Sequence, residues 1–328
     1  MKKTFNWGII GCGRIAHKFA SDIQTIADAG IYAVATRSLD KAKDFAKAHD
    51  APHALNSYEA LLQVEDLDAV YIATPHVLHA ENTIMALNAK MPVLCEKPLA
   101  MNAREVSQMI AAAEANDTFL MEALWTRFMP PINKVLEIIE SGEIGELHSV
   151  KADFGFAAEF KPEGRLFDPA LGGGSLLDIG IYPVFLALLL LGKPEQVDAR
   201  AVLGPTHVDS ICGMLLKFPG DKLAILDSTI LSDTKTEAFI YGSIGHIHIH
   251  SRWHEMTSLS LHLKGGGEVR HFDFENECLG YRYEAEEVMH CIASGKKQSE
   301  RMPHTFSRLL IESLDAIRYK AGIVYSVD

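Results

Sequence analysis

The 328 residues of the chain suffice for about two domains, and 48% apolar with 23% charged residues is typical of a globular protein. The formal net charge of -12 would repel a nucleic acid or an anionic membrane, so we expect neither as a partner. Five cysteines without a CxxC pair argue against a disulfide framework and favour the reducing cytoplasm, and no export signal is evident.

The first 122 residues alternate short apolar runs with segments of helical period, which is the βαβ pattern of a parallel sheet. Apolar residues recur at helical spacing from Ile15 to Ile26 and from Val106 to Ala113, and Asn102 with Glu105 resembles a capping box. The strands are predicted at residues 5–11, 32–36, 69–73, 93–95 and 119–123. We therefore expect a doubly wound α/β Rossmann domain over residues 1–123.

A glycine motif, GxGxxA, directly follows the first predicted strand and opens a helix. Its glycines permit a tight turn and a close approach of backbone N–H groups to a pyrophosphate, and the small third residue packs helix on strand. The residues of this loop expected to bind a dinucleotide are Gly11, Gly13, Arg14, Ile15 and Ala16. The alternative is a doubly wound sheet that binds no nucleotide.

The end of the second predicted strand holds Thr36, Arg37 and Ser38, where an NAD site usually has a carboxylate for the ribose 2′-hydroxyl. Arg37 and Ser38 could instead bind a 2′-phosphate through a charge-assisted fork and a hydroxyl. We therefore expect NADP rather than NAD. The alternative for Arg37 is a solvated loop charge.

From about residue 146 the pattern changes to alternating apolar and polar residues, which predicts a large, mostly antiparallel open sheet. We expect this sheet to belong to an α+β domain over residues 124–328. The eleven apolar residues at 181–191 are too few to span a membrane and predict a buried helix segment. Helices are predicted at 283–294 and 304–320, the second free to pack back toward the first domain. The predicted strands are 150–154, 197–201, 211–218, 223–230, 237–241, 246–250, 258–263 and 269–274, with a hairpin turn at glycines 265–267.

Several motifs together resemble the Gfo/Idh/MocA family of oxidoreductases. They are CEKP at 95–98, Ala73-Thr74-Pro75 with His79, EALWTRF at 122–128 and GGGSLLDIGIY at 172–182. The resemblance spans nearly the whole chain and is greatest to the branch of dimeric dihydrodiol dehydrogenases and NADP-dependent D-xylose dehydrogenases. Inositol dehydrogenases commonly have histidine where Tyr182 stands, which makes inositol a less favoured substrate.

The resemblance also implies roles for individual residues. Lys97 and Tyr182 form the acid/base pair, and Asp178 orients the substrate. Trp125 and Phe154 belong to the substrate pocket wall, with ordinary core aromatics as the alternative. The residues implied to contact the cofactor, besides the glycine loop and residues 36–38, are Ala73, Thr74, His76, His79, Glu96, Lys97 and Trp125.

The residues themselves are consistent with this chemistry. Asp178 and Tyr182 are four apart, so on a helix they share one face, although such a pair is also common on a protein surface. Hydride transfer from an alcohol needs a group that takes the hydroxyl proton, and a tyrosine does so near neutral pH only beside a cation. Lys97 is the candidate cation, and either member of the pair could carry the proton.

His246, His248 and His250 alternate along one predicted strand. The outer two would lie about 13 Å apart, too far to share one zinc ion, so we interpret them as a solvated strand face and expect no metal.

We therefore expect an NADP-dependent oxidoreductase that transfers hydride between the nicotinamide and a secondary hydroxyl of a pyranose sugar or cyclic trans-diol. It is expected to be a cytoplasmic homodimer with a polyol, sugar or diol substrate. One alternative is a non-catalytic NADP-binding sensor, because one fold serves many functions. Another is a hydrolase or isomerase that reduces and reoxidises a tightly bound cofactor within each turnover.

Overall fold

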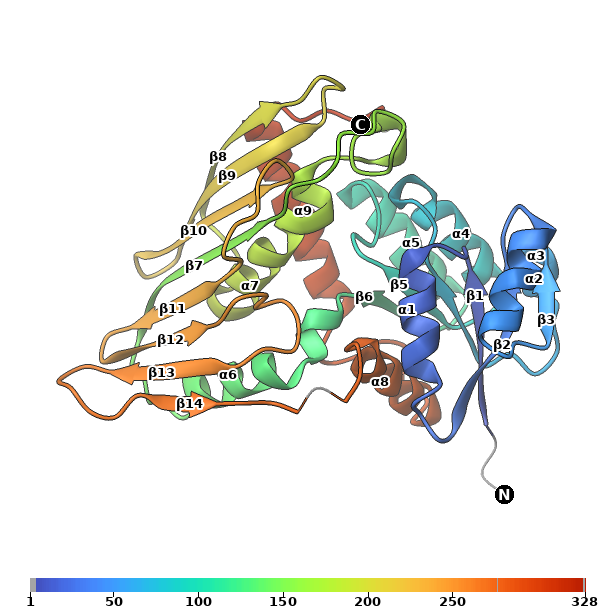
Figure 1. Ribbon diagram of the computed structural model, residues 1–328, viewed down its shortest axis with the longest axis horizontal. Coiled ribbons are helices and arrows are strands. Elements are labelled where there is room, and N and C mark those ends of the chain that lie inside the picture. The colour runs from blue at the N-terminus through green and yellow to red at the C-terminus, as the bar shows by residue number, and fades with distance from the viewer. Residues whose placement is uncertain (1–3, 276, 327) are drawn as a thin grey trace. The chain divides into compact units, whose positions relative to one another are not determined.

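A computed structural model describes residues 4–275, 277–326 and 328 (Figure 1). The chain forms two compact units. Unit 1 comprises residues 1–125 and 277–308, and unit 2 comprises residues 126–276 and 309–328.

Unit 1 is built around a parallel sheet of six strands in the order β3-β2-β1-β4-β5-β6, counted over the described residues. The three strands β4, β5 and β6 are buried along their length, as expected for strands with helices on both faces. The strands are β1 (Phe5–Ile10), β2 (Ala29–Ala35), β3 (His53–Leu55), β4 (Ala69–Ile72), β5 (Val93–Glu96) and β6 (Leu120–Ala123). The predicted Rossmann fold is confirmed.

The helices of unit 1 follow the predicted alternation. They are α1 (Arg14–Ile23), α2 (Leu39–Ala48), α3 (Tyr58–Leu61), α4 (His79–Asn88), α5 (Ala103–Ala115) and α8 (Tyr281–Ala293), with the short 3₁₀ helix η1 (His76–Leu78). Asn102 caps α5 by accepting the Glu105 N–H at 3.0 Å, and the Glu105 carboxylate accepts the Met101 N–H at 3.1 Å. The Asn102 cap is thereby confirmed.

Residues 277–308 group with unit 1, which differs from the predicted second domain of residues 124–328. Asp22 of α1 accepts the backbone N–H groups of Leu279 and Arg282, at 2.8 and 3.1 Å, where α8 begins. The Leu120 N–H donates to the carbonyl of Lys297 at 3.1 Å. A prediction from local patterning cannot detect such pairings, because the partners are far apart in the sequence.

Unit 2 contains a sheet of eight described strands in the order β14-β13-β12-β11-β7-β10-β9-β8. All neighbours are antiparallel except β7 and β10, which confirms the predicted mostly antiparallel sheet. The strands are β7 (Leu147–Gly155), β8 (Gln196–Leu203), β9 (Asp209–Phe218), β10 (Lys222–Thr229), β11 (Ala238–Gly242), β12 (Gly245–Ile249), β13 (Leu259–Leu263) and β14 (Arg270–Phe272). Gly265, Gly266 and Gly267 all have positive φ and lie in the turn between β13 and β14.

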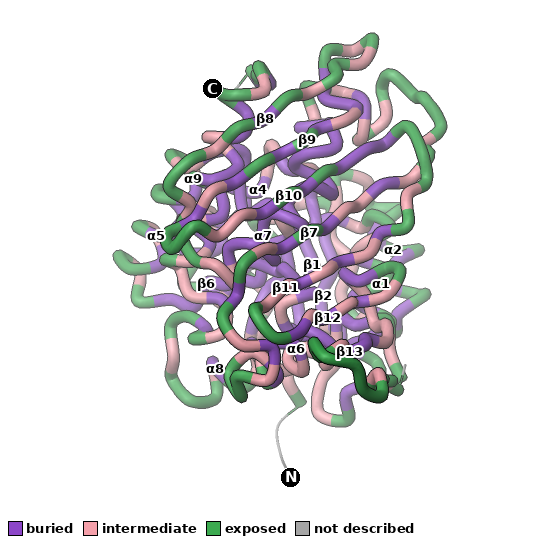
Figure 2. Tube along the Cα trace, turned by 90° about the vertical axis from the view of Figure 1, so that its left-hand side faces the viewer, coloured by how far each residue is buried: buried purple, intermediate pink, exposed green. Residues whose placement is uncertain are grey.

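Helix α7 (Ile181–Leu191) contacts β7 and β10, so it covers one face of this sheet. By length and composition alone, the stretch Pro169–Leu191 could cross a membrane. However, 83% of its most apolar 18-residue segment is buried inside the protein, as in a core helix. Buried and exposed residues alternate along β9 and β10, so these strands also have an exposed face (Figure 2). On that face Leu215 and Ile225 are directly opposite each other and are 41% and 45% exposed. The remaining helices are α6 (Pro130–Glu140) and α9 (His304–Ala321), the latter with its first five residues in unit 1 and the rest in unit 2.

Candidate active site

The glycine loop connects the end of β1 to the start of α1. Gly11 has φ +96°, and a Cβ there would lie 2.7 Å from the carbonyl oxygen of Ala73, so only glycine fits. Gly13 is exposed and a Cβ there would meet nothing within 4 Å, while Ala16 is fully buried. Helix α1 has no side-chain cap at Gly13, so its first N–H groups face this open space. The loop therefore fits a dinucleotide pyrophosphate, with Arg14 exposed and Ile15 half-buried beside it.

The residues after β2 carry no carboxylate. Arg37 is exposed and forms no ion pair with any residue that the structure describes. Ser38 caps α2 through its hydroxyl, which accepts the Lys41 N–H at 3.4 Å, and Thr36 donates its N–H to Leu55. The side chain of Arg37 can therefore reach an anion at the end of this strand without breaking an existing ion pair.

His79 holds together two loops at the carboxyl ends of β4 and β5. It is fully buried, and its ring nitrogens lie 2.9 Å from the carbonyl of Thr74 and 2.8 Å from the carbonyl of Pro98. The Thr74 hydroxyl accepts a hydrogen bond from Asn82. His79 therefore joins these two loops, and its predicted contact with the cofactor stays a prediction. Ala73 and Thr74 are also buried, and His76 is 5% exposed and packs edge-on against the His79 ring.

Two buried carboxylates support the backbone around Lys97. Glu96 accepts a hydrogen bond from the Tyr71 hydroxyl on one oxygen and the Lys97 N–H on the other. Glu122 accepts the Leu99 N–H at 2.9 Å, and burial raises the pKa of Glu122 to about 7. The Lys97 side chain is only half-buried. The backbone is thereby held on both sides of Lys97.

Trp125 lies at the end of unit 1 and is 6% exposed. Its ring stacks on Tyr281, with centroids 4.6 Å apart and planes 3° apart. Tyr281 is the first residue of α8, and its contribution was not predicted because it follows Trp125 by more than 150 residues. The stack fixes the orientation of an indole that the resemblance places at both the cofactor and the substrate.

Asp178 lies on a π-helix, η4 (Leu176–Gly180), which runs directly into α7. The prediction of a helix is confirmed, but its first turn is π rather than α. A Cβ on Gly180 would lie 2.8 Å from the Ser228 hydroxyl, so this turn packs against β10 at close range. Both oxygens of Asp178 are bound by the guanidinium of Arg165, at 2.7 and 3.1 Å.

Tyr182 is in the first turn of α7 and is 6% exposed. Its ring packs against Phe154, with centroids 5.6 Å apart, and against His254, with centroids 5.3 Å apart. Phe154 and His254 stack on each other at 4.0 Å. Phe154 also packs on the buried cluster formed by Phe167, Ile179 and Ile230. The structure therefore brings the predicted residues Phe154 and Tyr182 together and adds His254, which the sequence did not indicate.

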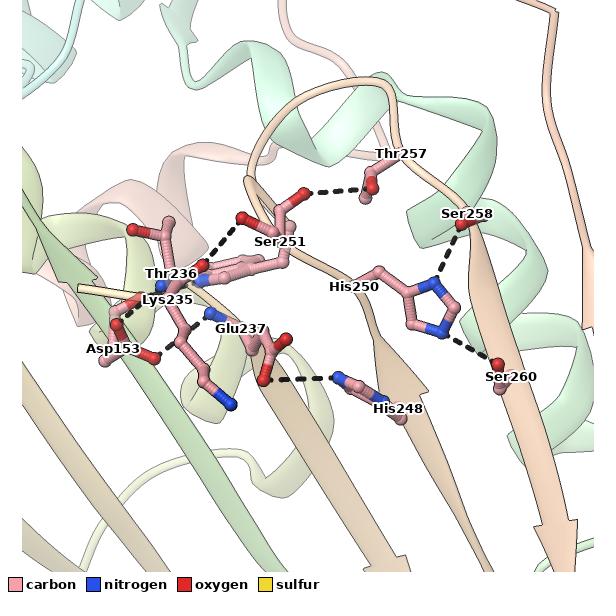
Figure 3. Close-up of polar contacts among 11 residues, drawn as sticks. Asp153, Lys235, Thr236, Glu237, His248, His250, Ser251, Thr257, Ser258 and Ser260 are labelled. Atoms are coloured by element: carbon pink, nitrogen blue, oxygen red, sulfur yellow. Dashed lines mark hydrogen bonds and ion pairs between the residues drawn. The ribbon is translucent and has the colours of Figure 1, made fainter. Parts of the chain in front are cut away.

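Asp153, the neighbour of Phe154, binds Thr236 and Glu237 (Figure 3) and also anchors the segment that carries His254. The carboxylate of Asp153 accepts the N–H groups of Thr236 and Glu237, and the Trp253 indole donates to the Asp153 carbonyl at 2.9 Å. Ser251 bonds to the carbonyl of Lys235 at 2.8 Å. These contacts hold the aromatic surface around Tyr182.

His254 has an acidic partner. Its Nε2 lies 3.4 Å from the Glu255 carboxylate, which Arg252 also binds. Burial opposes the ionised form of Glu255, but the hydrogen bonds from His254 and Arg252 hold the pKa of Glu255 at about 2. The carboxylate therefore stays ionised beside His254.

The predicted histidine face is half-buried rather than solvated. His246 stacks on His262 with ring centroids 4.5 Å apart, and His248 stacks on Phe239 at 4.2 Å. Burial and the charge of His262 lower the pKa of His246. His250 bonds instead to Ser258 and Ser260 (Figure 3). No group of three or more metal-ligating side chains occurs among the described residues.

Two family models match successive parts of the chain. Residues 5–124 match the family model described as "Oxidoreductase family, NAD-binding Rossmann fold", and residues 132–248 match the "GFO/IDH/MocA C-terminal domain". The chain is 41% identical to trans-1,2-dihydrobenzene-1,2-diol dehydrogenase of Danio rerio and 34% identical to that of Homo sapiens. Both alignments cover 99% of each protein.

The fold matches KijD10, a 3-ketoreductase from Actinomadura kijaniata solved with NADP and TDP-benzene, with a TM-score of 0.88, 26% identity and coverage of 97% of this chain and 98% of that one. Variants of that ketoreductase with a lysine changed to alanine and a tyrosine changed to phenylalanine have also been solved. The chain thus belongs to the Gfo/Idh/MocA family of oxidoreductases, as its motifs indicated.

Proposed function

We propose that this enzyme is an NADP-dependent dehydrogenase that oxidises a secondary hydroxyl of a cyclic trans-diol or a pyranose sugar. The observation that carries the proposal is the placement of Asp178 and Tyr182 on consecutive helical turns, with Tyr182 packed on the aromatic side chains of Phe154 and His254. The full-length similarity to curated trans-dihydrodiol dehydrogenases supports the substrate class.

The proposed preference for NADP over NAD rests on residues of unit 1. The open space at Gly13 admits a pyrophosphate, and the exposed Arg37 offers a cation where an NAD site would have a carboxylate. Ser38 adds a hydroxyl at the same turn. The ketoreductase with the matching fold was solved with NADP, which supports the same choice here.

In the proposed reaction, the glycine loop and Arg37 would hold NADP⁺, whose nicotinamide would supply the acceptor for the hydride on the carbon that bears the hydroxyl group. We assign the hydroxyl proton to the pair Lys97 and Tyr182, in which the ammonium favours the phenolate form of the tyrosine. The carboxylate of Asp178 accepts hydrogen bonds from substrate hydroxyls and sets their orientation. Loss of a hydride and a proton converts the secondary alcohol to a ketone.

The test is a screen for NADP⁺ reduction with trans-1,2-dihydrobenzene-1,2-diol, D-xylose, D-glucose and other pyranoses. We expect net NADPH formation with at least one of them, and a lower rate when NAD⁺ replaces NADP⁺. If substrate is consumed with no net NADPH, the chain acts as a hydrolase or isomerase with internal redox. If NADPH binds but none of these compounds is consumed, the sensor alternative replaces the proposal.

We propose that the enzyme is a homodimer assembled through the exposed face of the sheet in unit 2. Support comes from the large apolar residues on neighbouring strands of that face, Leu215 and Ile225, which a second copy would cover. Light scattering should give about twice the chain mass of 36.1 kDa. Ile225→Glu should dissociate the dimer, whereas Ile244→Glu, an equally apolar and 51% exposed position in the turn after β11, should not. A monomeric unmodified protein would contradict the proposal.

We also propose a cytoplasmic location. All five cysteines are free, and three of them are buried, which suits a reducing compartment. The net charge of -12 supports a small-molecule partner rather than a nucleic acid.

A further inference from the structure

Arg165 forms a bidentate ion pair with Asp178. Its Nη1 donates to Oδ1 at 2.7 Å and its Nη2 donates to Oδ2 at 3.1 Å. The Asp178 side chain is 9% exposed, whereas that of Arg165 is 42% exposed. Such a bidentate pair fixes the plane of the carboxylate and favours its charged form. No sequence motif indicated Arg165, which precedes Asp178 by 13 residues in a loop.

The loop that carries Arg165 is held by its own backbone. The carbonyl of Gly164 accepts the N–H groups of Phe167 and Asp168, both at 2.9 Å, and the carbonyl of Leu166 accepts the Gly174 N–H at 2.9 Å. A Cβ on Gly173 would lie 2.8 Å from the Leu166 carbonyl, so the two ends of the loop approach at close range. The backbone on the C-terminal side of Arg165 is therefore closed on itself.

Side chains attach the same loop to the helix that carries Asp178. Phe167 is 4% exposed and packs in a buried cluster with Ile179, the residue after Asp178. The Tyr325 hydroxyl donates to the Gly173 carbonyl at 2.6 Å. The guanidinium therefore reaches Asp178 from a backbone whose position is set by packing, so its geometry is ready before any substrate arrives.

A half-exposed ion pair contributes little to folding, so stability alone does not account for this arrangement. Its chemical effect is larger. The guanidinium binds both carboxylate oxygens, so it fixes the plane in which this carboxylate accepts hydrogen bonds. A neighbouring cation also favours the ionised carboxylate, the form that only accepts hydrogen bonds.

We propose that Arg165 is a positioning residue of the active site, which keeps Asp178 ionised and aligned so that it accepts hydrogen bonds from the vicinal hydroxyls of the substrate. The proposal rests on the proposed function, in which Asp178 orients the substrate. Arg165 acts through Asp178 and performs no proton transfer. It is a specificity determinant because a fixed acceptor plane distinguishes one diol geometry from another.

The test compares Arg165→Met, Arg165→Lys and Asp178→Asn, with Lys161→Met as the matched control. Lys161 lies in the same loop and pairs with Glu159, with a side chain that is 66% exposed, so its removal takes the same charge without touching Asp178. Steady-state kinetics use the best substrate from the screen. NADPH affinity and thermal unfolding are measured in parallel and should match the unmodified protein in all four variants.

We expect Arg165→Met to lower kcat/KM at least about tenfold, mainly by raising KM, and Lys161→Met to change it less than about twofold. Arg165→Lys should recover part of the loss, because one hydrogen bond and the charge remain. The double variant Arg165→Met with Asp178→Asn should be no worse than Asp178→Asn alone, because both changes remove one function.

The pH profile separates positioning from a merely structural role. Without the guanidinium, Asp178 is protonated more easily, so the acidic limb of kcat/KM should move to higher pH in Arg165→Met and stay in place in Lys161→Met. Other titratable groups around this segment include Asp168 in the loop, Tyr325 bound to Gly173, Asp209 bound to Leu176, and Tyr182 and His254 beside Phe154. They are present in both variants, so their contribution cancels in the comparison.

Two outcomes would overturn the proposal, and they are distinguishable. If Asp178→Asn retains full activity, the proposed role of Asp178 is wrong and that of Arg165 goes with it. If Asp178→Asn is impaired but Arg165→Met behaves like Lys161→Met, only the role of Arg165 is wrong. Should Arg165→Met fail to fold, Arg165→Lys decides, because a lysine that leaves KM and the acidic limb unchanged would contradict the need for the bidentate pair.

Discussion

The carboxylate of Asp209 accepts the backbone N–H of Leu176 at 2.7 Å, so the first residue of β9 holds the first residue of the π-helix that carries Asp178. The same oxygen accepts the Ser175 hydroxyl at 2.7 Å. Asp209 is fully buried, and burial raises its pKa to about 6 although these hydrogen bonds oppose the rise. The placement of Asp178 thus depends on a buried acid that titrates near neutral pH.

Asp209→Asn should therefore change the pH dependence of stability. An acid whose pKa is higher in the folded state binds more protons there, so its contribution falls as pH rises from about 4 to about 6 and is constant above. We expect the unmodified protein to lose about 2 kcal/mol relative to Asp209→Asn between about pH 4.5 and 7.5. Urea unfolding of both proteins between about pH 4.5 and 7.5 measures this difference. A difference that does not change with pH would contradict the prediction.

Gly174→Ala should destabilise unit 2. Gly174 has φ +120°, and a Cβ there would lie 2.1 Å from Oδ1 of Asp209. Strain and overpacking together should lower the free energy of unfolding by about 2–5 kcal/mol. Gly192→Ala is the control, because Gly192 also has positive φ but a Cβ there meets nothing within 4 Å. Equal losses for both variants in urea unfolding would show that the contact with Asp209 is not the cause.

Gly13→Ala should separate cofactor binding from folding. The added Cβ meets no protein atom within 4 Å, so stability should change little, while the space for the pyrophosphate is filled. We expect the dissociation constant for NADPH, measured by fluorescence titration, to rise at least about tenfold. Gly11→Ala should instead lower stability, because its Cβ would meet the carbonyl of Ala73. Unchanged NADPH affinity in Gly13→Ala would place the cofactor elsewhere.

Arg37→Asp should remove the preference for NADPH over NADH. We expect the unmodified enzyme to bind NADPH at least about tenfold more tightly, a difference of about 1.4 kcal/mol. The variant should lose this preference and retain NADH binding, whereas charge reversal at the exposed Lys43 of α2 should leave it intact. Calorimetric titration with both nucleotides measures the effect. Equal affinities in the unmodified protein would make Arg37 an ordinary surface charge.

Tyr182→Phe should abolish most turnover without unfolding the protein, because one hydroxyl is lost and the packing on Phe154 and His254 is retained. We expect kcat to fall by about 100- to 10,000-fold with NADPH affinity nearly unchanged. Lys97→Met should cause a comparable loss, and the double variant should cost less than the product of the two. A Tyr182→Phe enzyme that keeps more than about a third of its activity would remove Tyr182 from the pair.

Local patterning was sufficient to predict the two sheets, the glycine loop and the absence of a carboxylate after β2. Each of these depends on residues close together in the sequence, through alternation along a strand, helical spacing or a turn that only glycine permits. The short β3 was not predicted, because a three-residue, half-buried edge strand offers too little alternation. The predicted solvated face of His246 and His248 was wrong because neighbouring strands stack rings on it.

Tertiary structure alone decided which side chains surround the predicted residues. Arg165 reaches Asp178 because its loop closes through the Leu166 carbonyl, and His254 packs on Tyr182 because a distant loop is anchored to Asp153. Likewise residues 277–308 join unit 1 through hydrogen bonds to α1 and β6. Periodicity in a sequence reports which face of an element is buried. It carries no information on which distant element covers that face, because that depends on how complementary surfaces meet after the chain has folded.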